Sequence, residues 1–297
     1  MVFNFVSQSD ICLMNIIRAE HMGMCFGVRD AITLATKETA STPLTILGDL
    51  VHNETVLSNL RAHGIKFEQE IEAVTTDSVM ITAHGASEKS INEIKARGLK
   101  VLEATCPLVH FAHRSVAELA RDGYHPVIIG KRDHVEVRGL TGDLKAFDVV
   151  LSEADIENLQ ERARFGIAAQ TTQPIEKVQR LVGIVRKKFP NSEVRFVDTV
   201  CRPTKQRQFA AVELAQKSDV VVVVGGAHSN NTHELVKTCG RYCPRVHHVQ
   251  FANDLRSEWF ENAGIVGITA GTSTPDSTIN EVEQALRQLA DNVCNRN

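Results

Sequence analysis

Short apolar runs alternate with longer amphipathic stretches along most of the chain, and most apolar runs end in a polar or glycine-rich tip. This alternation predicts parallel β-strands connected by α-helices, so the expected fold class is α/β. The runs predict strands at 16–19, 43–47, 79–82, 100–104, 126–129, 147–151, 165–169, 194–198, 220–224 and 265–269.

The predicted elements fall into three similar units, which indicates three parallel α/β modules in a pseudo-threefold arrangement. Each unit is expected to open with a strand that ends at a cysteine, namely Cys25, Cys106 or Cys201. We therefore expect an N-terminal extension at 1–15 and modules at 16–99, 100–192 and 193–297, the third with a C-terminal helix.

The repeat extends to the tips of the strands. The three cysteines are 81 and 95 residues apart, and each is followed after 27 or 28 residues by a polar residue, namely His52, His134 and Ser229. Ligands bind beyond the carboxyl ends of parallel strands. We therefore expect all the tips to converge on one central cavity.

Three single cysteines, one in each module, form neither a disulfide pair nor a CxxC redox motif. Cys106 precedes Pro107 and a predicted helix, so its sulfur is expected near the positive end of that helix, where a thiol makes a good metal ligand. Zinc would need a fourth ligand or a water. A [4Fe–4S] cluster with three thiolate ligands and one open iron fits three equivalent arms better. The alternative, three small buried apolar side chains, explains the repeat less well.

Hydroxyl, amide and imidazole groups occupy the tips, directly before predicted helices. Such donors at helix N-termini make an anion site, in particular for phosphate. No Walker loop or GxGxxG fingerprint occurs, so a nucleotide is not indicated. Ser229 and Asn231 could instead be helix caps only. The candidate donors are His52, His84, His134, Thr171, Thr172, Ser229, Asn231 and Ser273.

Glu136 is the carboxylate that stands two residues from a tip histidine, His134. In a strand-like segment, residues two apart face the same side, so both side chains are expected to enter the cavity together. Beside a bound anion and a cluster, Glu136 is the natural proton donor. The alternative is a solvated loop residue.

A net charge of −3 and a pI near 6.5 imply no general attraction to nucleic acid or to an anionic membrane. No apolar run reaches the roughly 18 residues of a membrane span, and the first ten residues do not resemble a signal or transit peptide. Seven cysteines, an odd number, do not indicate a disulfide framework. We expect a cytoplasmic protein, as a monomer or homodimer, with no nucleic-acid or membrane partner.

Nine short motifs stand at the predicted tips: GMCFGV (23–28), VHN (51–53), AHG (83–85), ATCPLV (104–109), HVEV (134–137), QTT (170–172), DTVC (198–201), SNNT (229–232) and TAGTS (269–273). Together they resemble the signature set of the 4-hydroxy-3-methylbut-2-enyl diphosphate reductase family, also called LytB, in the family's order. The resemblance covers about residues 16–292.

This resemblance implies three α/β domains around a central [4Fe–4S] cluster, with Cys25, Cys106 and Cys201 as ligands and one iron open to the allylic hydroxyl of the substrate. Two electrons and protons would remove that hydroxyl as water from (E)-4-hydroxy-3-methylbut-2-enyl diphosphate. The products would be isopentenyl and dimethylallyl diphosphate, in the last step of the methylerythritol phosphate route to isoprenoids. The electrons would come from ferredoxin or flavodoxin, because no flavin or nicotinamide site is visible.

The resemblance also implies roles for single residues. Glu136 matches the proton-delivering acid, and Thr171 matches the residue that orients it and the hydroxyl. His134 is expected mainly to hold the diphosphate, with proton donation as an alternative role. The residues that match diphosphate binders are His52, His84, His134, Ser229, Asn230, Asn231 and Ser273.

The chain departs from the family pattern at Met24, where Phe is usual, and at His228, where Asn is common. Cys239 and Cys243 could share one helix face, but they match no family ligand and are interpreted as ordinary thiols. Two other classes stay open from the residues alone. One is a binding protein for a phosphorylated metabolite, and the other is a zinc-dependent hydrolase that uses the same three tip cysteines.

Overall fold

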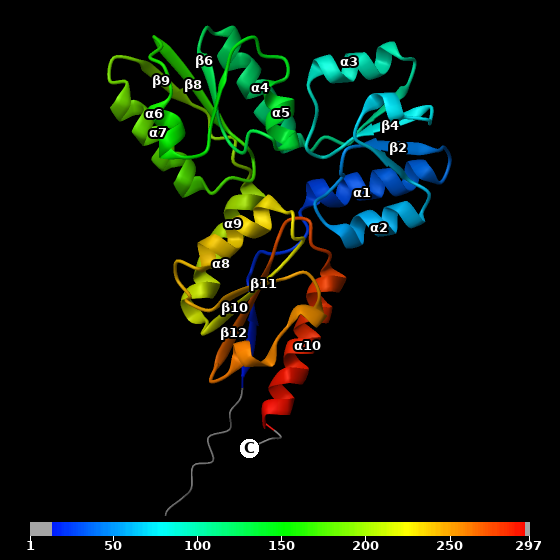
Figure 1. The fold of residues 1–297 in the computed structure, drawn as a ribbon, viewed down its shortest axis with the longest axis vertical. Coiled ribbons are helices and arrows are strands. Elements are labelled where there is room, and N and C mark those ends of the chain that lie inside the picture. The colour runs from blue at the N-terminus through cyan, green and yellow to red at the C-terminus, as the bar shows by residue number, and fades with distance from the viewer. Residues whose placement is uncertain (1–13, 295–297) are drawn as a thin grey trace, which may run out of the picture.

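Three α/β modules meet at the centre of the molecule, as Figure 1 shows. The structure, a computed structural model, describes residues 14–294. The predicted extension at 1–15, with Cys12, lies outside the described residues except for its last two positions. The predicted fold class, three parallel α/β modules, is confirmed. No helix in this part of the chain combines the length and apolar character that a membrane span needs.

Each module contains one four-stranded sheet in which all neighbouring strands are parallel. The order is β3-β2-β4-β5 in module 1, β7-β6-β8-β9 in module 2 and β11-β10-β12-β1 in module 3. The strands are β1 (Asn15–Arg18), β2 (Leu44–Leu47), β3 (Lys66–Glu68), β4 (Ser78–Ile81), β5 (Lys100–Glu103), β6 (His125–Ile129), β7 (Asp148–Val150), β8 (Arg164–Ala169), β9 (Glu193–Phe196), β10 (Val220–Val224), β11 (Val246–Val249) and β12 (Ile265–Ala270).

The shared order has a direct consequence for ligand binding. In each sheet the chain runs outward from one central strand and then returns to the other side of it, which creates a topological switch point. These points lie between β2 and β4, between β6 and β8, and between β10 and β12. Ligands bind at the carboxyl ends of strands at such points. The tips that follow these six strands are therefore the expected binding surface.

The strand before each cysteine was expected to be the first strand of a module. It is instead an edge strand in the sheet of a different module. β1 pairs with β12 of module 3, β5 with β4 of module 1, and β9 with β8 of module 2. The sheets therefore differ by one strand from the predicted boundaries at 16–99, 100–192 and 193–297. Because each cysteine follows one of these strands, the chain passes from one module to the next at Cys25, Cys106 and Cys201.

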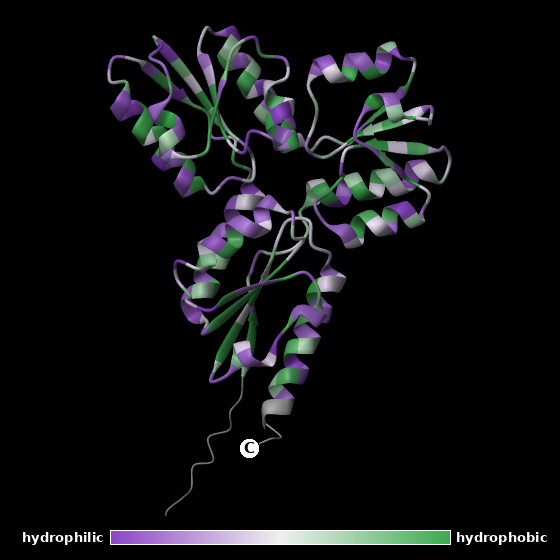
Figure 2. Cartoon of the chain, viewed as in Figure 1, coloured by the Kyte–Doolittle hydropathy of each residue, from purple (hydrophilic) through white to green (hydrophobic). Residues whose placement is uncertain are grey.

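The helices cover both faces of the sheets, and Figure 2 shows apolar residues concentrated on the strands and on parts of the helices. Three of them, α1, α4 and α8, begin directly after the cysteines, and α4 and α8 have a proline in the first turn, where its missing N–H is harmless. The helices are α1 (Phe26–Thr39), α2 (Glu54–Ala62), α3 (Glu88–Ala96), α4 (Pro107–Arg121), α5 (Val135–Thr141), α6 (Glu153–Glu157), α7 (Ile175–Lys188), α8 (Arg202–Lys217), α9 (Asn230–Cys239) and α10 (Asp276–Cys294).

The core of module 3 explains why its central strand consists of five valines. Successive strand side chains point to opposite faces of a sheet. Val220, Val222 and Val224 pack with Ile268 on one side, whereas Val221 and Val223 pack on the other side against α8. A strand that is buried on both faces has no polar position, and such a rigid core holds the tip after β10 in place.

Candidate functional site

The three tip cysteines are fixed by the same backbone contact in all three modules. Each is the residue directly before a helix, and its N–H donates to a carbonyl at the tip of the neighbouring strand of the preceding sheet. The contacts are Cys25 N to Thr272 O (3.0 Å), Cys106 N to Ala83 O (3.1 Å) and Cys201 N to Thr171 O (3.0 Å). The expected pseudo-threefold repeat thus holds at the level of single hydrogen bonds.

The three cysteines line one cavity, here called the thiol cavity, together with His84, Glu136, Thr171, Thr172 and Thr272. All three are free thiols. Burial raises the pKa of Cys106, and it raises the pKa of Cys201 to about 11. A buried thiol releases its proton when it coordinates a metal ion, because the cation compensates the charge of the thiolate. The thiol cavity therefore suits a soft metal centre.

Two neighbouring residues accommodate the cysteine sulfurs, one by leaving space and one by accepting a hydrogen bond. A Cβ atom added to Gly27 would lie 2.6 Å from Cys106 Sγ, so only glycine leaves room for this sulfur. The Cys201 thiol donates to Thr204 Oγ1 at 3.1 Å. Thr204 lies in the first turn of α8 and is fully buried.

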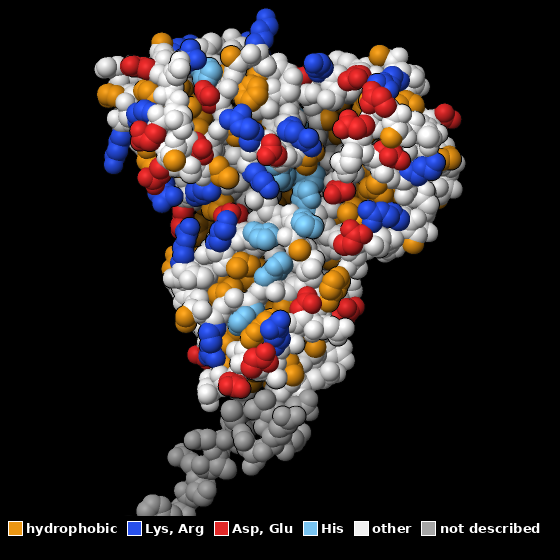
Figure 3. Space-filling model, in the orientation of Figure 1, with side chains coloured by type: hydrophobic (Ala, Val, Ile, Leu, Met, Phe, Trp, Pro, Cys, Tyr) orange, Lys and Arg blue, Asp and Glu red, His pale blue; other side chains and the backbone are white. Residues whose placement is uncertain are grey.

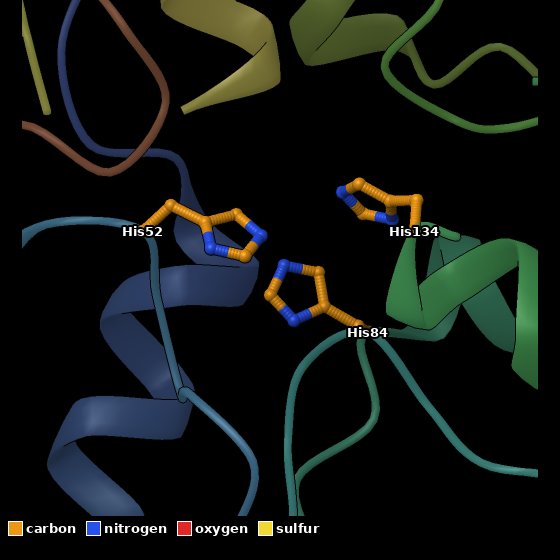
Figure 4. Close-up of side chains that lie close together, drawn as sticks. All are labelled: His52, His84 and His134. Carbon is orange, nitrogen blue, oxygen red and sulfur yellow. The ribbon is translucent and has the colours of Figure 1, made fainter. Parts of the chain in front are cut away.

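Three histidines from three different tips come together beside the thiol cavity (Figure 4). His52 follows β2, His84 follows β4, and His134 precedes α5. Their ring centroids are 5.3–5.5 Å apart, and one nitrogen of each lies within 4.8 Å of the others. In the space-filling view of Figure 3, histidines gather where the modules meet. Such a triad can hold either an anion or a metal ion.

Burial keeps these three imidazoles neutral. It lowers the pKa of His52, and burial together with the neighbouring histidines lowers the pKa of His84 well below its usual value. The pKa of His134 falls to about 4 for the same reasons. His134 Nδ1 accepts from the Glu136 N–H at 3.1 Å, so its proton resides on Nε2, which can donate to a ligand.

Module 3 supplies further donors to a second cavity, here called the histidine cavity. Its walls include the three histidines and Ser229, Asn230, Asn231 and Ser273. Within residues 14–294, Ser273 Oγ and Asn230 Nδ2 are buried without a hydrogen-bond partner. A buried donor without a partner is unfavourable until a ligand accepts from it. These two groups are therefore matched to an anion.

The alternative of helix capping holds for Ser229, and Asn231 has a comparable structural contact. Ser229 Oγ accepts from Thr232 N at 3.3 Å and caps α9. Asn231 Oδ1 accepts from Thr272 N at 3.0 Å and so joins two tips of module 3. Both side chains keep a donor, the hydroxyl hydrogen or the amide NH₂, on the wall of the histidine cavity.

Glu136 is 1% exposed and lies in the first turn of α5. The expected strand-like segment at 134–136 is therefore wrong, because His134 caps a helix there. Glu136 still reaches the thiol cavity, whereas His134 lines the histidine cavity. The two cavities adjoin, since both are lined by Val28, His84, Thr172 and Thr272.

Thr171 holds the Glu136 carboxyl group. Its N–H donates to Oε1 at 2.6 Å and its hydroxyl donates to Oε2 at 3.0 Å. Burial raises the pKa of Glu136 to about 7, against the two hydrogen bonds from Thr171, which lower it. The side chain can therefore gain and lose a proton near neutral pH, which is the property of a general acid.

Sequence reasoning missed three residues that support the site: Thr204, Arg207 and the backbone of Thr272. Thr204 and Arg207 lie one and nearly two turns after Cys201, so helical spacing from that cysteine is a signal that could have found them. The other cysteines lie elsewhere. Helix α9 ends at Cys239, and Cys243 follows the turn at 240–242, so they do not share a helix face. Both are buried in the core of module 3.

The fold and the site define a class of protein in which three parallel α/β modules enclose a three-thiol cavity and an adjoining cavity lined by donors. Within this class, the chain belongs to the LytB family, because the family model described as LytB protein matches residues 16–287. The resemblance expected from the nine motifs is thereby confirmed.

Named relatives agree over nearly the whole chain. The 4-hydroxy-3-methylbut-2-enyl diphosphate reductase of Aquifex aeolicus is 36% identical over 286 residues, which cover 94% of this chain and 98% of the relative. That of Geobacter metallireducens is 34% identical over 278 residues, covering 93% and 98%.

Two solved structures are also similar. One is an (E)-4-hydroxy-3-methyl-but-2-enyl diphosphate reductase, described as the terminal enzyme of the non-mevalonate pathway, with 35% identity, a TM-score of 0.68, and coverage of 93% of this chain and 99% of that one. The other is the E-1-hydroxy-2-methyl-but-2-enyl-4-diphosphate reductase from Plasmodium falciparum, with 26% identity, a TM-score of 0.87, and coverage of 92% and 88%.

The Glu136 carboxyl group should titrate near pH 7, where its pKa of about 7 places it. Thr171→Val removes the hydroxyl that stabilises the carboxylate form, so the titration should move to higher pH. Infrared or NMR titration of protein with isotopically labelled glutamate measures both. Thr172→Val, which removes a hydroxyl that does not contact Glu136, is the matched control. Titration at an ordinary glutamate pKa in the unmodified protein would contradict the burial argument.

Proposed function

We propose that the chain reduces (E)-4-hydroxy-3-methylbut-2-enyl diphosphate to isopentenyl and dimethylallyl diphosphate, the last step of the methylerythritol phosphate route. The observation that carries this proposal is the order of groups along the two adjoining cavities. Three thiols and a buried acid line one of them, and three neutral histidines and unpartnered donors line the other. A small molecule with an alcohol at one end and a diphosphate at the other matches this order.

The proposed cofactor is a [4Fe–4S] cluster with Cys25, Cys106 and Cys201 as ligands. Two observations support the fit: the three half-buried free thiols share one cavity, and Gly27 leaves space for one sulfur. When bound, such a cluster supplies electrons and an open iron position. The tip cysteines are a better set for iron–sulfur chemistry than the histidine triad, because clusters of this kind are held by thiolates.

The proposed diphosphate site is the histidine cavity. His52, His84 and His134 bring ring nitrogens together there, and Ser273 and Asn230 present donors that lack a partner in the described part of the chain. Hydrogen bonds from neutral donors to a charged acceptor contribute about 1.5–3 kcal/mol each. Ser229 and Asn231 complete the wall.

The proposed acid is Glu136, with Thr171 as the residue that orients it. Replacing the hydroxyl by hydrogen uses two electrons and two protons; the C–O bond breaks, and the oxygen leaves as water. The protonated Glu136 carboxyl group can supply a proton to that oxygen, and its pKa of about 7 permits reprotonation after each cycle. His134, with a pKa of about 4, is a poor proton donor at neutral pH and is assigned to the diphosphate.

The proposed electron donors are ferredoxin or flavodoxin. Neither the sequence nor the two cavities offers the glycine-rich loop at which a nicotinamide or flavin dinucleotide would bind. This supports a separate redox protein as the proposed source of the electrons.

Serine in place of Cys25, Cys106 or Cys201 should remove most of the bound iron, because a hydroxyl is a hard and poor ligand for an iron–sulfur cluster. Cys239→Ser is the control and should keep the iron content of the unmodified protein. Iron and sulfide analysis after anaerobic purification measures the effect. Full loading in any of the first three variants would exclude that cysteine from the ligand set, and zinc in place of iron would refute the cluster.

Gly27→Ala should also lower the iron content, although it removes no ligand, because its methyl group would lie 2.6 Å from Cys106 Sγ and displace the sulfur. Gly183→Ala is the matched control in another helix. No atom lies within 4 Å of a Cβ there, so alanine should stabilise α7 by up to about 1 kcal/mol and leave iron unchanged. Equal loading of both variants would show that the contact at Gly27 is unimportant.

Binding of inorganic diphosphate should take up protons at neutral pH. The free site holds its histidines neutral, with lowered pKa values, and a bound anion raises those values. Affinity should therefore fall as the pH rises through the range in which the bound histidines lose their protons. Calorimetry in buffers of different ionisation enthalpy measures the uptake, and His84→Gln should reduce it. Absence of competition between diphosphate and substrate would refute the site.

Glu136→Gln tests the whole proposal. Glutamine keeps the shape and a hydrogen bond but cannot deliver a proton, so turnover of the diphosphate substrate should fall roughly 10²–10⁴-fold. Iron content and diphosphate affinity should stay near those of the unmodified protein. Product formation is measured anaerobically with excess chemical reductant, so that electron supply does not limit the rate. Near-normal turnover would exclude Glu136 as the acid, and no product from the unmodified protein would refute the function.

A further inference from the structure

Arg207 is a buried cation without a carboxylate partner. It is 8% exposed, and among residues 14–294 no Asp or Glu oxygen lies within ion-pair distance of it. In the described part of the chain its guanidinium group donates to two backbone carbonyls alone, Nε to Gly23 O and Nη1 to Pro203 O, both at 3.0 Å. A buried charge is strongly unfavourable unless an opposite charge compensates it. The protein therefore needs an anion near this side chain.

The two carbonyls show where that anion belongs. Gly23 lies two residues before Cys25, and Pro203 lies two residues after Cys201, so Arg207 connects the segments that carry two of the tip cysteines. Burial lowers the pKa of Arg207, whereas negative charge on Cys25 and on Cys201 raises it. A guanidinium stays charged under all these influences.

Two other cations beside the same segments have carboxylate partners. Arg29, one turn after Cys25 on α1, is about half exposed and pairs with Asp276 at 3.0 Å. Lys205, one turn after Cys201, pairs with Asp198 at 2.6 Å. These cations have carboxylate partners and contact with water, so Arg207 is distinguished from both by its burial and by the lack of a carboxylate.

We infer that Arg207 is the resident counter-ion of the anionic group held by Cys25 and Cys201, and that it raises the reduction potential of that group. The inference rests on the proposed cluster ligands. Net charge and hydrogen bonding are among the factors that set the potential of an iron–sulfur cluster. Reduction adds negative charge, which a fixed cation in a low-dielectric site favours. Arg207 lines neither the thiol cavity nor the histidine cavity, so the role inferred for it is electrostatic rather than catalytic.

The test is the reduction potential of the anaerobically purified, cluster-loaded protein. Arg207→Gln keeps a donor but removes the charge. The equilibrium constant for one-electron reduction should therefore fall at least about tenfold, which corresponds to a potential about 59 mV more negative. Arg207→Lys keeps the charge and should stay close to the unmodified protein. Arg29→Gln removes a solvent-exposed, paired cation near the same cysteine and should change the potential little.

The outcomes separate this inference from the proposed function. Iron and sulfide in the unmodified protein test the cluster, and only the shift in potential tests Arg207. Equal potentials in the protein and in Arg207→Gln, or equal shifts in the Gln and Lys variants, would overturn the inference. If Arg207→Gln takes up no cluster, Arg207→Lys decides alone: it must load iron and retain the potential, and failure of either would overturn the inference.

Discussion

The hydrogen bond from each tip cysteine to the neighbouring strand tip is the contact on which the rest of the site depends. It continues the pairing of an edge strand with its neighbour past the ends of both strands, at the point where the chain passes to the next module. Three such bonds, repeated with nearly equal lengths, turn three separate sheets so that their carboxyl ends meet. The cavities exist because of this convergence, since no single module encloses one.

Burial at the meeting point then sets the charges of the site. The same loss of water acts on acids and bases in opposite directions, raising the pKa of Glu136 and lowering that of the three histidines. Burial therefore disfavours the charged forms of Glu136, of the three histidines and of the Cys106 and Cys201 thiols, whereas the Arg207 guanidinium stays a cation. A site in this state has a deficit of negative charge, which suits both a thiolate-bound cluster and a diphosphate.

The site cysteines and several strand tips could be predicted from the sequence, because a threefold repeat shows the same pattern of residues three times. Cys25, Cys106 and Cys201 stood out through their spacing, and the tips of β2, β4 and β6 were correctly placed at one cavity. Pairing of the preceding strands could not be predicted, because alternation identifies a strand but not its neighbour. The strand-like backbone predicted at 134–136 was wrong because a two-residue spacing fits a strand but also fits a cap followed by a helix, whereas His134 does line a cavity. Arg207 was missed because its carbonyl partner Gly23 is 184 residues away.

The departures from threefold symmetry would allow this symmetric scaffold to bind the asymmetric substrate proposed for it. The positions after β1, β5 and β9 are all cysteine, which suits a cofactor with equivalent arms. The positions after β2, β6 and β10 differ, with His52, His134 and Ser229. The positions after β4, β8 and β12 differ as well, with His84, Thr171 and Ser273. Within residues 14–294, a buried acid, Glu136, stands at the tips of module 2 alone, so the proposed proton donor lies on one side of the cavities. Symmetry therefore serves the proposed cofactor, and its loss at the other tips gives the cavity the direction that a molecule with two different ends requires.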